Sequence, residues 1–505
     1  GGTNTTGGAG RLLLSSGTVT AGGGSMSTQA RWDLEGGTVS GAGSLALNGT
    51  ANWTGTFFNG GSTTSFGGAL AISGSGMHDV VGAAVTFAGT TTWTNANAGN
   101  LGQIRGGNST TLTNTGSFVD ATVANTSINV AYGGGASFTN SGTYQKTGGS
   151  TVNVSMAFNN LAGGTLQVDN GTLQLAGGGS GGGKIDVADA ATLEYSGGTH
   201  TISGWTGGTG TGRVLVSGGV VNTSGSNALT GRVALSGGAL NASGTLNTGG
   251  FDMSSGTLGG SGALDVNLAA NSTGAWTNGL ISRSGTTTVT GPLAIAGIGN
   301  HDVVGGRLVL AGTSTWTNAN AGNLGPIRTG GAAVIDNSGS FLDQISASTT
   351  INNVYGGGAT FINSGTYTKT GTGTTTAQIV FNNTGTLNGT GLLVLSAGGT
   401  HTGNFAMDEG GTVQLNGGTH TFGGTNTTGG AGRLLLSSGT ATAGGGSMST
   451  TARWDLEGGT VSGAGSLALN GAANWTGTVF NSGSNTSFGG ALAIIGNGVH
   501  DVNGA

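Results

Sequence analysis

Three adjacent His-Asp pairs are the clearest candidates for acid–base chemistry in this sequence. An imidazole beside a carboxylate is a common general-base arrangement. Successive side chains of a β-strand point to opposite faces, so chain neighbours cannot form a dyad within a strand. A loop that turned both groups outward would allow one, but no serine motif accompanies the pairs, and a structural role is favoured. The pairs are His78-Asp79, His301-Asp302 and His500-Asp501.

A second candidate is the carboxylate pair of the segment ARWDLEGG. Asp33 and Glu35 lie at positions i and i+2, and the same residues recur as Asp455 and Glu457. Because residues i and i+2 of a strand share a face, Arg31 would line up with them. Two carboxylates on one face can hydrolyse a glycosidic bond, but they also form ordinary ion clusters. Arg31 is close enough to neutralise them, which favours the ion cluster.

Tryptophans provide a third candidate, because an exposed indole face can stack on a sugar ring. A tryptophan that fills the core of a β-structure would explain the same residues equally well. Both interpretations stay open at this point. The residues concerned are Trp53, Trp93, Trp276, Trp316 and Trp475.

The remaining histidines, His200, His401 and His420, each follow the sequence Gly-Gly-Thr. His401 and His420 are separated by an offset of 19, so they could stack in adjacent coils of a repeat and share a metal ion. His200 has no histidine at that spacing. We therefore expect these histidines to be structural and predict no metal site.

Two further patterns resemble binding motifs. Gly178, Gly183 and Lys184 have the spacing of a phosphate-binding loop, but Ile185 replaces the hydroxyl residue that binds magnesium, and no helix is expected after it. Threonine runs at 90–92 and 286–288 could form flat ice-binding arrays, although packing of β-branched side chains explains them more simply. Acidic residues are too sparse for calcium-binding nonapeptides. We predict no cofactor.

The composition limits the class of protein that could position these side chains. The chain has 505 residues with 114 glycines, 2 prolines and no cysteine, and its net charge is −5. Without cysteine there are no disulfides and no thiolate metal sites. The small number of cations gives no basic surface for nucleic acid. No apolar run reaches the ~18 residues of a membrane helix. A flexible linker is the simplest alternative, but apolar residues alternate regularly in runs such as TLQVDNGTLQL.

Internal repeats dominate the chain. Residues 1–83 recur at 423–505, an offset of 422, with 73 of 83 positions identical. The His-Asp-Val motifs divide this period into two unequal half-units, with offsets of 223 and 199. The half-units differ by about one smaller repeat. We predict one continuous array over 1–505, with the end of a unit at 1–77, half-units at 78–300 and 301–499, and the start of another at 500–505.

The smallest repeats predict an all-β fold. Runs of about four to six residues rich in Val, Leu, Ile and Thr alternate with Gly-Gly, Asn-Gly or Ser-Gly, and no helical period is present. Asn170-Gly171 could close a hairpin, but a corner between faces of a solenoid is preferred. We predict a right-handed parallel β-helix with coils of about 19–24 residues and a length on the order of 120 Å. Pro292 and Pro326 should occupy strand starts or corners.

The segments GGTHT, FTNSGTYQKTG, FNNTGTLNGTG, TLQLAGGG and GAGSLALNG resemble giant repetitive bacterial surface proteins of the filamentous-haemagglutinin and autotransporter-passenger type. The resemblance implies a secreted β-helix used in adhesion, biofilm or cell-surface fibres, and it transfers no catalytic residues. The chain begins without an initiator methionine or signal peptide, so we expect a segment of a longer polypeptide or a processed piece.

Together these observations predict a non-enzymatic, extracellular structural rod. It would associate end to end with further copies or continue covalently into further repeats, and surface glycans are a further expected partner. The alternative is a carbohydrate-binding or carbohydrate-degrading β-helix protein, which would use the tryptophans or Asp33 and Glu35.

Overall fold

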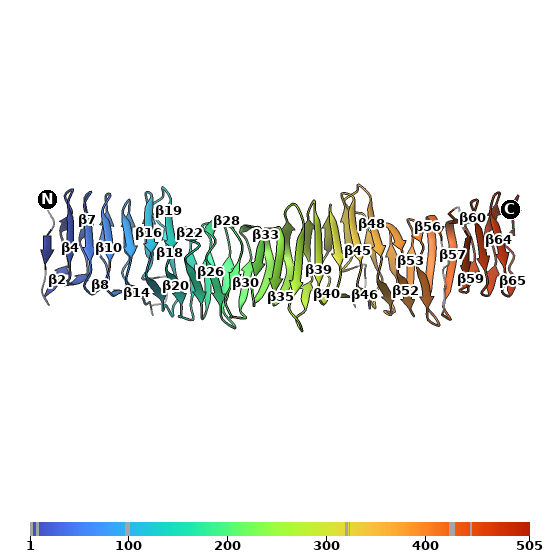
Figure 1. Ribbon diagram of the computed structural model, residues 1–505, viewed down its shortest axis with the longest axis horizontal. Helices are drawn as coiled ribbons and strands as arrows, with labels where there is room; N and C mark the ends of the chain where they lie inside the picture. The colour runs from blue at the N-terminus through green and yellow to red at the C-terminus, as the bar shows by residue number, and fades with distance from the viewer. Residues whose placement is uncertain are drawn as a thin grey trace. The chain divides into compact units, whose positions relative to one another are not determined.

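The computed structural model describes residues 10–95, 101–318, 322, 324–423, 430–444 and 447–505, and the backbone of 4–6. The chain divides into two compact units, Gly1–Gly250 and Phe251–Ala505. Each unit is a parallel β-solenoid, and the two together make about 23 turns. Figure 1 shows the strands of each unit side by side as arrows. Within the described residues there is no helix, as predicted. The handedness of the coil remains a prediction.

Each regular coil consists of three short strands, and strand n pairs with strand n+3. These pairings are parallel, so equivalent residues of successive coils lie one above the other. Three successive coils of the first unit contain β16 (Thr110–Asn114), β17 (Ser117–Asp120), β18 (Thr126–Val130), β19 (Ala136–Asn140), β20 (Thr143–Lys146), β21 (Thr151–Val154), β22 (Ala157–Asn160), β23 (Thr165–Val168) and β24 (Thr172–Leu175).

The second unit repeats this arrangement. Its coils pair in the same register, with each inward residue above its counterpart. The strands equivalent to those of the first unit are β45 (Ala333–Asn337), β46 (Ser340–Asp343), β47 (Thr349–Asn352), β48 (Ala359–Asn363), β49 (Thr366–Lys369), β50 (Thr375–Ala377), β51 (Val380–Asn383), β52 (Thr386–Gly389) and β53 (Leu392–Leu395).

The coils vary in length more than the sequence indicated. Ser25 pairs with Ser44, an offset of 19, whereas Ala84 pairs with Thr111, an offset of 27. The predicted range of coil lengths, which ended at 24, is therefore too narrow. Strands must stay in register to keep their hydrogen bonds, so the loops between them absorb the extra residues.

The Asn170-Gly171 dipeptide forms a corner, as preferred. The flanking strands β23 and β24 pair with strands of the coils before and after, not with each other. Gly171 has a φ of 68°, and a Cβ there would lie 2.4 Å from the carbonyl oxygen of Ser150. Only glycine fits both conditions.

The two prolines stand where the prediction put them, immediately before a strand. Pro292 precedes β40 (Leu293–Ala296) and Pro326 precedes β44 (Ile327–Gly330). Each carbonyl still accepts a hydrogen bond from the neighbouring coil, from Gly274 N at 2.9 Å and His301 N at 3.0 Å. A proline at these places removes no donor from the strand that follows.

Aromatic and aliphatic side chains fill the interior in columns. Phe138 stacks on Phe158 with ring centroids 5.4 Å apart and an interplanar angle of 9°. In the second unit Phe361 stacks on Phe381 at 5.0 Å and 7°. All four rings are buried. The parallel register places like residues one coil apart, and this spacing suits offset ring stacking.

Buried asparagines form a hydrogen-bonded ladder beside each aromatic column. Asn337 Nδ2 donates to Asn363 Oδ1 at 2.7 Å, and Asn363 Nδ2 donates to Asn383 Oδ1 at 2.8 Å. Each amide also donates to a backbone carbonyl of the next turn, as Asn363 does to Thr386 O at 2.9 Å. Asn114, Asn140 and Asn160 repeat the ladder in the first unit. These bonds satisfy buried corner carbonyls that strands cannot reach.

We expect an Asn363→Leu variant to lose about 1–3 kcal/mol of folding free energy for each buried polar group that is left without its partner. The change removes the donor to Asn383 and to Thr386 O, and it removes the acceptor of Asn337. Hydrogen exchange of β45, β48 and β51 should accelerate. Thr360→Val, a change at a half-buried position of the same strand, is the control. If the two variants were equally protected from hydrogen exchange, the ladder would not be a source of stability.

Candidate functional site

The His-Asp pairs are split between the inside and the outside of the coil. His78 and Asp79 lie in β12 (His78–Val81). His78 is fully buried, and its Nε2 lies 3.1 Å from Trp53 O. Asp79 points the other way, to Arg105. His301 and Asp302 in β41 (His301–Val304) repeat this division. In both of these pairs the imidazole and the carboxylate face opposite ways and form no dyad, as the alternation of side chains in a strand predicts.

On the outside, each of these aspartates belongs to an Asp–Arg–Tyr cluster. Arg105 Nε and Nη2 donate to the two carboxylate oxygens of Asp79 at 2.6 and 2.7 Å, and Tyr132 OH donates to Oδ2 at 2.9 Å. The guanidinium also lies over the Tyr132 ring, 5.4 Å from its centroid. The hydrogen bond to Asp79 raises the pKa of Arg105. The cluster is closed on itself, because each of its charged groups already has a partner.

The second unit carries the same cluster at an offset of 223. Asp302 receives hydrogen bonds from Arg328 at 2.7 Å and from Tyr355 at 2.7 Å. Sequence reasoning missed both clusters, because their members come from three different coils. The recurrence of Tyr132 as Tyr355 was the available signal.

Asp33 lies within an ion cluster, as the sequence favoured. It is buried in β5 (Arg31–Leu34), and its carboxylate binds Arg11, Arg31 at 3.1 Å and Asn52 Nδ2 at 2.7 Å. Burial raises the pKa of Asp33, but the hydrogen bonds from Asn52 and the two arginines outweigh it, and the pKa lies below its usual value. Glu35 remains about half exposed and pairs with Arg11.

Asp455 repeats this cluster in the second unit. Its partners are Arg433 at 2.6 Å, Arg453 at 3.1 Å and Asn474 Nδ2 at 2.9 Å. A glycosidase needs one carboxyl that keeps its proton and one that is free to act at the sugar. Both buried aspartates are instead saturated by cationic and amide donors, so this cluster lacks the arrangement for hydrolysis.

The five candidate tryptophans all lie in the interior. Trp53, Trp93 and Trp316 have no exposed surface, and the others expose 8% or less. Trp53 Nε1 donates to Thr56 O at 2.8 Å, and Trp316 Nε1 donates to Gly325 O at 3.2 Å. Stacking on glycans requires an exposed indole face, so this role is corrected to one in the core for Trp53, Trp93, Trp276, Trp316 and Trp475.

His401 and His420 do stack in adjacent coils. The rings are 5.3 Å apart, and His401 Nε2 lies 3.0 Å from His420 Nδ1. His420 Nε2 lies 3.0 Å from Gly417 O and must donate to it, so Nδ1 is the acceptor for His401. Burial lowers the pKa of His401 to about 3 and that of His420 to about 4. Among the described residues, no three metal-binding side chains come together.

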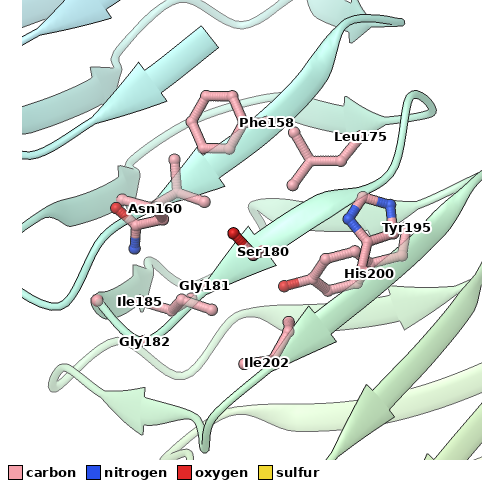
Figure 2. A pocket seen from close by; sticks show the side chains of 12 residues that line it. Phe158, Asn160, Leu175, Ser180, Gly181, Gly182, Ile185, Tyr195, His200 and Ile202 are labelled. Carbon is pink, nitrogen blue, oxygen red and sulfur yellow. The ribbon is translucent and has the colours of Figure 1, made fainter. Parts of the chain in front are cut away.

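The glycine-rich stretch around Lys184 forms part of the solenoid wall. Lys184 opens β26 (Lys184–Val187), not a helix, so no phosphate-binding loop is formed. Figure 2 shows the adjoining cavity, which Phe158, Tyr195 and His200 line. Its volume is about 20 Å³, enough for roughly one water molecule and no larger ligand.

The threonine runs do not form outward arrays. Thr91 and Thr287 are buried, and only their neighbours face outward. Thr92 lies between Ala71 and Val119 of the adjacent coils, so its column on the surface is not a threonine column. Packing of β-branched side chains accounts for the runs.

A feature that sequence reasoning missed is a buried Lys–Asp pair in each unit. Lys369 Nζ lies 3.3 Å from Asp343 Oδ1, and Lys146 Nζ lies 3.9 Å from Asp120 Oδ2. All four residues are buried. The spacing of these lysines and aspartates in the sequence was the available signal. Each lysine follows its aspartate by one coil, and the second pair repeats the first at an offset of 223.

Comparisons with protein-family models, with curated proteins and with solved structures gave no significant match. Within the described residues, no helix has the length and apolar character needed to cross a membrane.

Proposed function

We propose that this chain is a non-enzymatic structural element, the shaft of a secreted bacterial surface fibre, filament or adhesin. Adhesion, biofilm or cell-surface matrix would be its setting, and the resemblance of its repeats to bacterial surface proteins supports an extracellular location. The observation that carries the proposal is the in-register stacking of like coils, whose interior columns and ladders recur in both units.

The internal repeat shows how a further coil buries the apolar residues of a strand. Leu70 and Ile72 are buried, with 2% and 0% of their surface exposed, whereas the equivalent Leu492 and Ile494 are 37% and 56% exposed. The first pair lies in a strand with a neighbour on both sides, and the second in a strand for which the described residues supply one neighbour. The strands are β11 (Leu70–Ile72) between β8 (Ala51–Trp53) and β14 (Thr90–Trp93), and β65 (Leu492–Ile494) beside β62 (Ala473–Trp475).

In the first copy of the repeat this same sequence is covered by a further coil. Where this sequence has a coil on each side, its apolar residues are buried, so similar coils can stack on one another repeatedly. Stacking of this kind builds a shaft from similar coils, through main-chain hydrogen bonds, apolar contacts and the asparagine ladders.

The carbohydrate alternative has less support. The tryptophans that would bind a sugar are buried, and Asp33 is held by two arginines and an amide. The interior columns and ladders, in contrast, recur in both units and serve the stacking of coils. We assign the chain a structural role because its recurring polar groups bind each other.

Electron microscopy of the purified chain tests the proposal. We expect thin rods whose length grows by ~4.8 Å per turn, together with longer end-to-end assemblies at high concentration. An Ile494→Lys variant should reduce these assemblies in sedimentation velocity experiments, because it places a charge on an apolar side chain that is 56% exposed in the purified chain. Val380→Lys changes an exposed residue in other coils and serves as the control. Compact globules, or equal association of the two variants, would refute the proposal.

A further inference from the structure

The two buried Lys–Asp pairs are placed for a covalent reaction. We propose that Asp120 and Lys146, and likewise Asp343 and Lys369, condense into intramolecular amide bonds that cross-link adjacent coils. The two members of each pair are register partners on neighbouring strands, β17 with β20 and β46 with β49. Each bond would thus join one coil to the next inside the solenoid.

The geometry brings the amine close to the carboxyl group. Lys369 Nζ lies 3.3 Å from Asp343 Oδ1, so the amine nitrogen is in direct contact with the carboxyl group whose Cγ it would attack. Lys146 Nζ is 3.9 Å from Asp120 Oδ2, so a small side-chain movement brings it to the same separation. Both lysines also donate to the carbonyl oxygen of a following glycine, Gly371 O and Gly148 O, each at 2.9 Å. These bonds hold the amines beside the carboxyl groups.

Hydroxyl groups hold the carboxyl oxygen that would stay in the amide. Tyr367 OH and Thr375 Oγ1 donate to Asp343 Oδ2 at 2.7 and 2.5 Å, opposite the oxygen that Lys369 approaches. In the other pair Thr122 donates through N and Oγ1 to Asp120 Oδ1, at 3.1 and 2.7 Å. Donors at the carbonyl oxygen stabilise the negative charge that develops there during attack.

Burial favours the reactive protonation states. An ionised carboxylate and an ammonium are both costly in an apolar interior. Desolvation accordingly raises the pKa of Asp343 and lowers the pKa of Lys369, and it acts in the same directions on Asp120 and Lys146. A neutral amine is a nucleophile, whereas an ammonium is not.

The reaction balances without a further reagent. The Nζ atom of the neutral lysine forms a bond to Cγ of the neutral aspartic acid, and the bond from Cγ to the hydroxyl oxygen breaks. One proton from Nζ joins the departing hydroxyl group, which leaves as water. The product is a neutral secondary amide, and it removes two buried ionisable groups at once. Exclusion of bulk water from the interior opposes the reverse hydrolysis.

The third lysine of the chain provides an internal control. Lys184 Nζ lies 3.8 Å from Asp186 Oδ2, a separation like that of Lys146, but both side chains are partly exposed. Bulk water reaches both groups, and both lie on one strand rather than on adjacent coils. We expect no amide there.

Intact-mass spectrometry of the full-length, denatured chain tests the proposal. The expected mass is lower than that of the sequence by two water molecules, and an amine-reactive reagent should label Lys184 but neither Lys146 nor Lys369. Peptide mapping should recover the branched peptides that contain each pair. A mass equal to that of the sequence would overturn the proposal. Loss of one water would support it for the pair that the map identifies and reject it for the other.

Variants assign the bonds without relying on stability. Lys369→Met should restore the mass of one water, and Lys146→Met should do the same for the first unit. The matched Lys184→Met control should leave the deficit of two waters unchanged. Because the mass of the parent chain decides the question by itself, a variant that fails to fold does not weaken the test.

Discussion

A Phe361→Ala variant is expected to lose about 3–5 kcal/mol of local stability, the usual range for truncating a buried phenylalanine. Phe361 has no exposed surface. Its ring stacks on Phe381 at 5.0 Å and meets Phe341 and Tyr367 edge-on at 5.7 and 5.9 Å. The truncation leaves a cavity in the middle of a column, and rigid neighbouring coils cannot move in to fill it.

Hydrogen exchange with peptide resolution is the appropriate measurement, because a solenoid opens in local segments rather than all at once. Protection should fall in β45 to β51 and remain unchanged several coils away. Ile362→Ala, at a half-buried position of the same strand, is the matched control and should have a small effect. If both variants lost the same protection, the stacked column would not be the source of the stability.

Acidification from pH 7 to pH 5 is expected to weaken the coils around His401 and His420 by about 4 kcal/mol for the pair. Burial holds the pKa of the folded histidines at about 3 and about 4, against an ordinary value of 6.5. Below pH 6.5 the unfolded chain therefore binds two protons that the folded chain does not. The stability that these two neutral histidines contribute is fully present above pH 6.5, and it is lost as the pH falls toward 4.

The hydrogen bonds explain why the folded pair resists protonation. His420 Nδ1 accepts from His401 Nε2, so a proton added to Nδ1 would face another N–H group. The other rings around His401 include Phe405 and Phe422, which provide no counter-charge. A charge buried among apolar rings is strongly disfavoured.

Protection factors measured at pH 7 and pH 5 test this prediction in β54 (Gly399–His401) and β56 (Thr412–Phe422). A double variant, His401→Phe with His420→Phe, should remove the pH dependence of these strands. His301→Phe, in other coils of the same unit, should leave it unchanged. An undiminished pH dependence in the double variant would contradict the assignment to this pair.

Some of these properties were set by the sequence alone. The alternation of apolar residues, the glycine corners and the nested repeat spacings determined a parallel β-solenoid, because stacked coils require like residues at regular intervals. The opposite orientation of His78 and Asp79 followed from the alternation of side chains in a strand. The placement of Pro292 before a strand followed from its missing N–H.

The tertiary structure decided matters that depend on which face a strand turns inward and on which coils are adjacent. Trp53 and Trp93 fit an exposed or a buried position equally well until the register fixed their burial. Register offsets that vary between 18 and 27 hid the neighbours of each side chain, so the pairing of Lys369 with Asp343 could not be read from one fixed repeat. Alternation is a local property of the backbone, whereas contact between coils depends on the length of every loop between them.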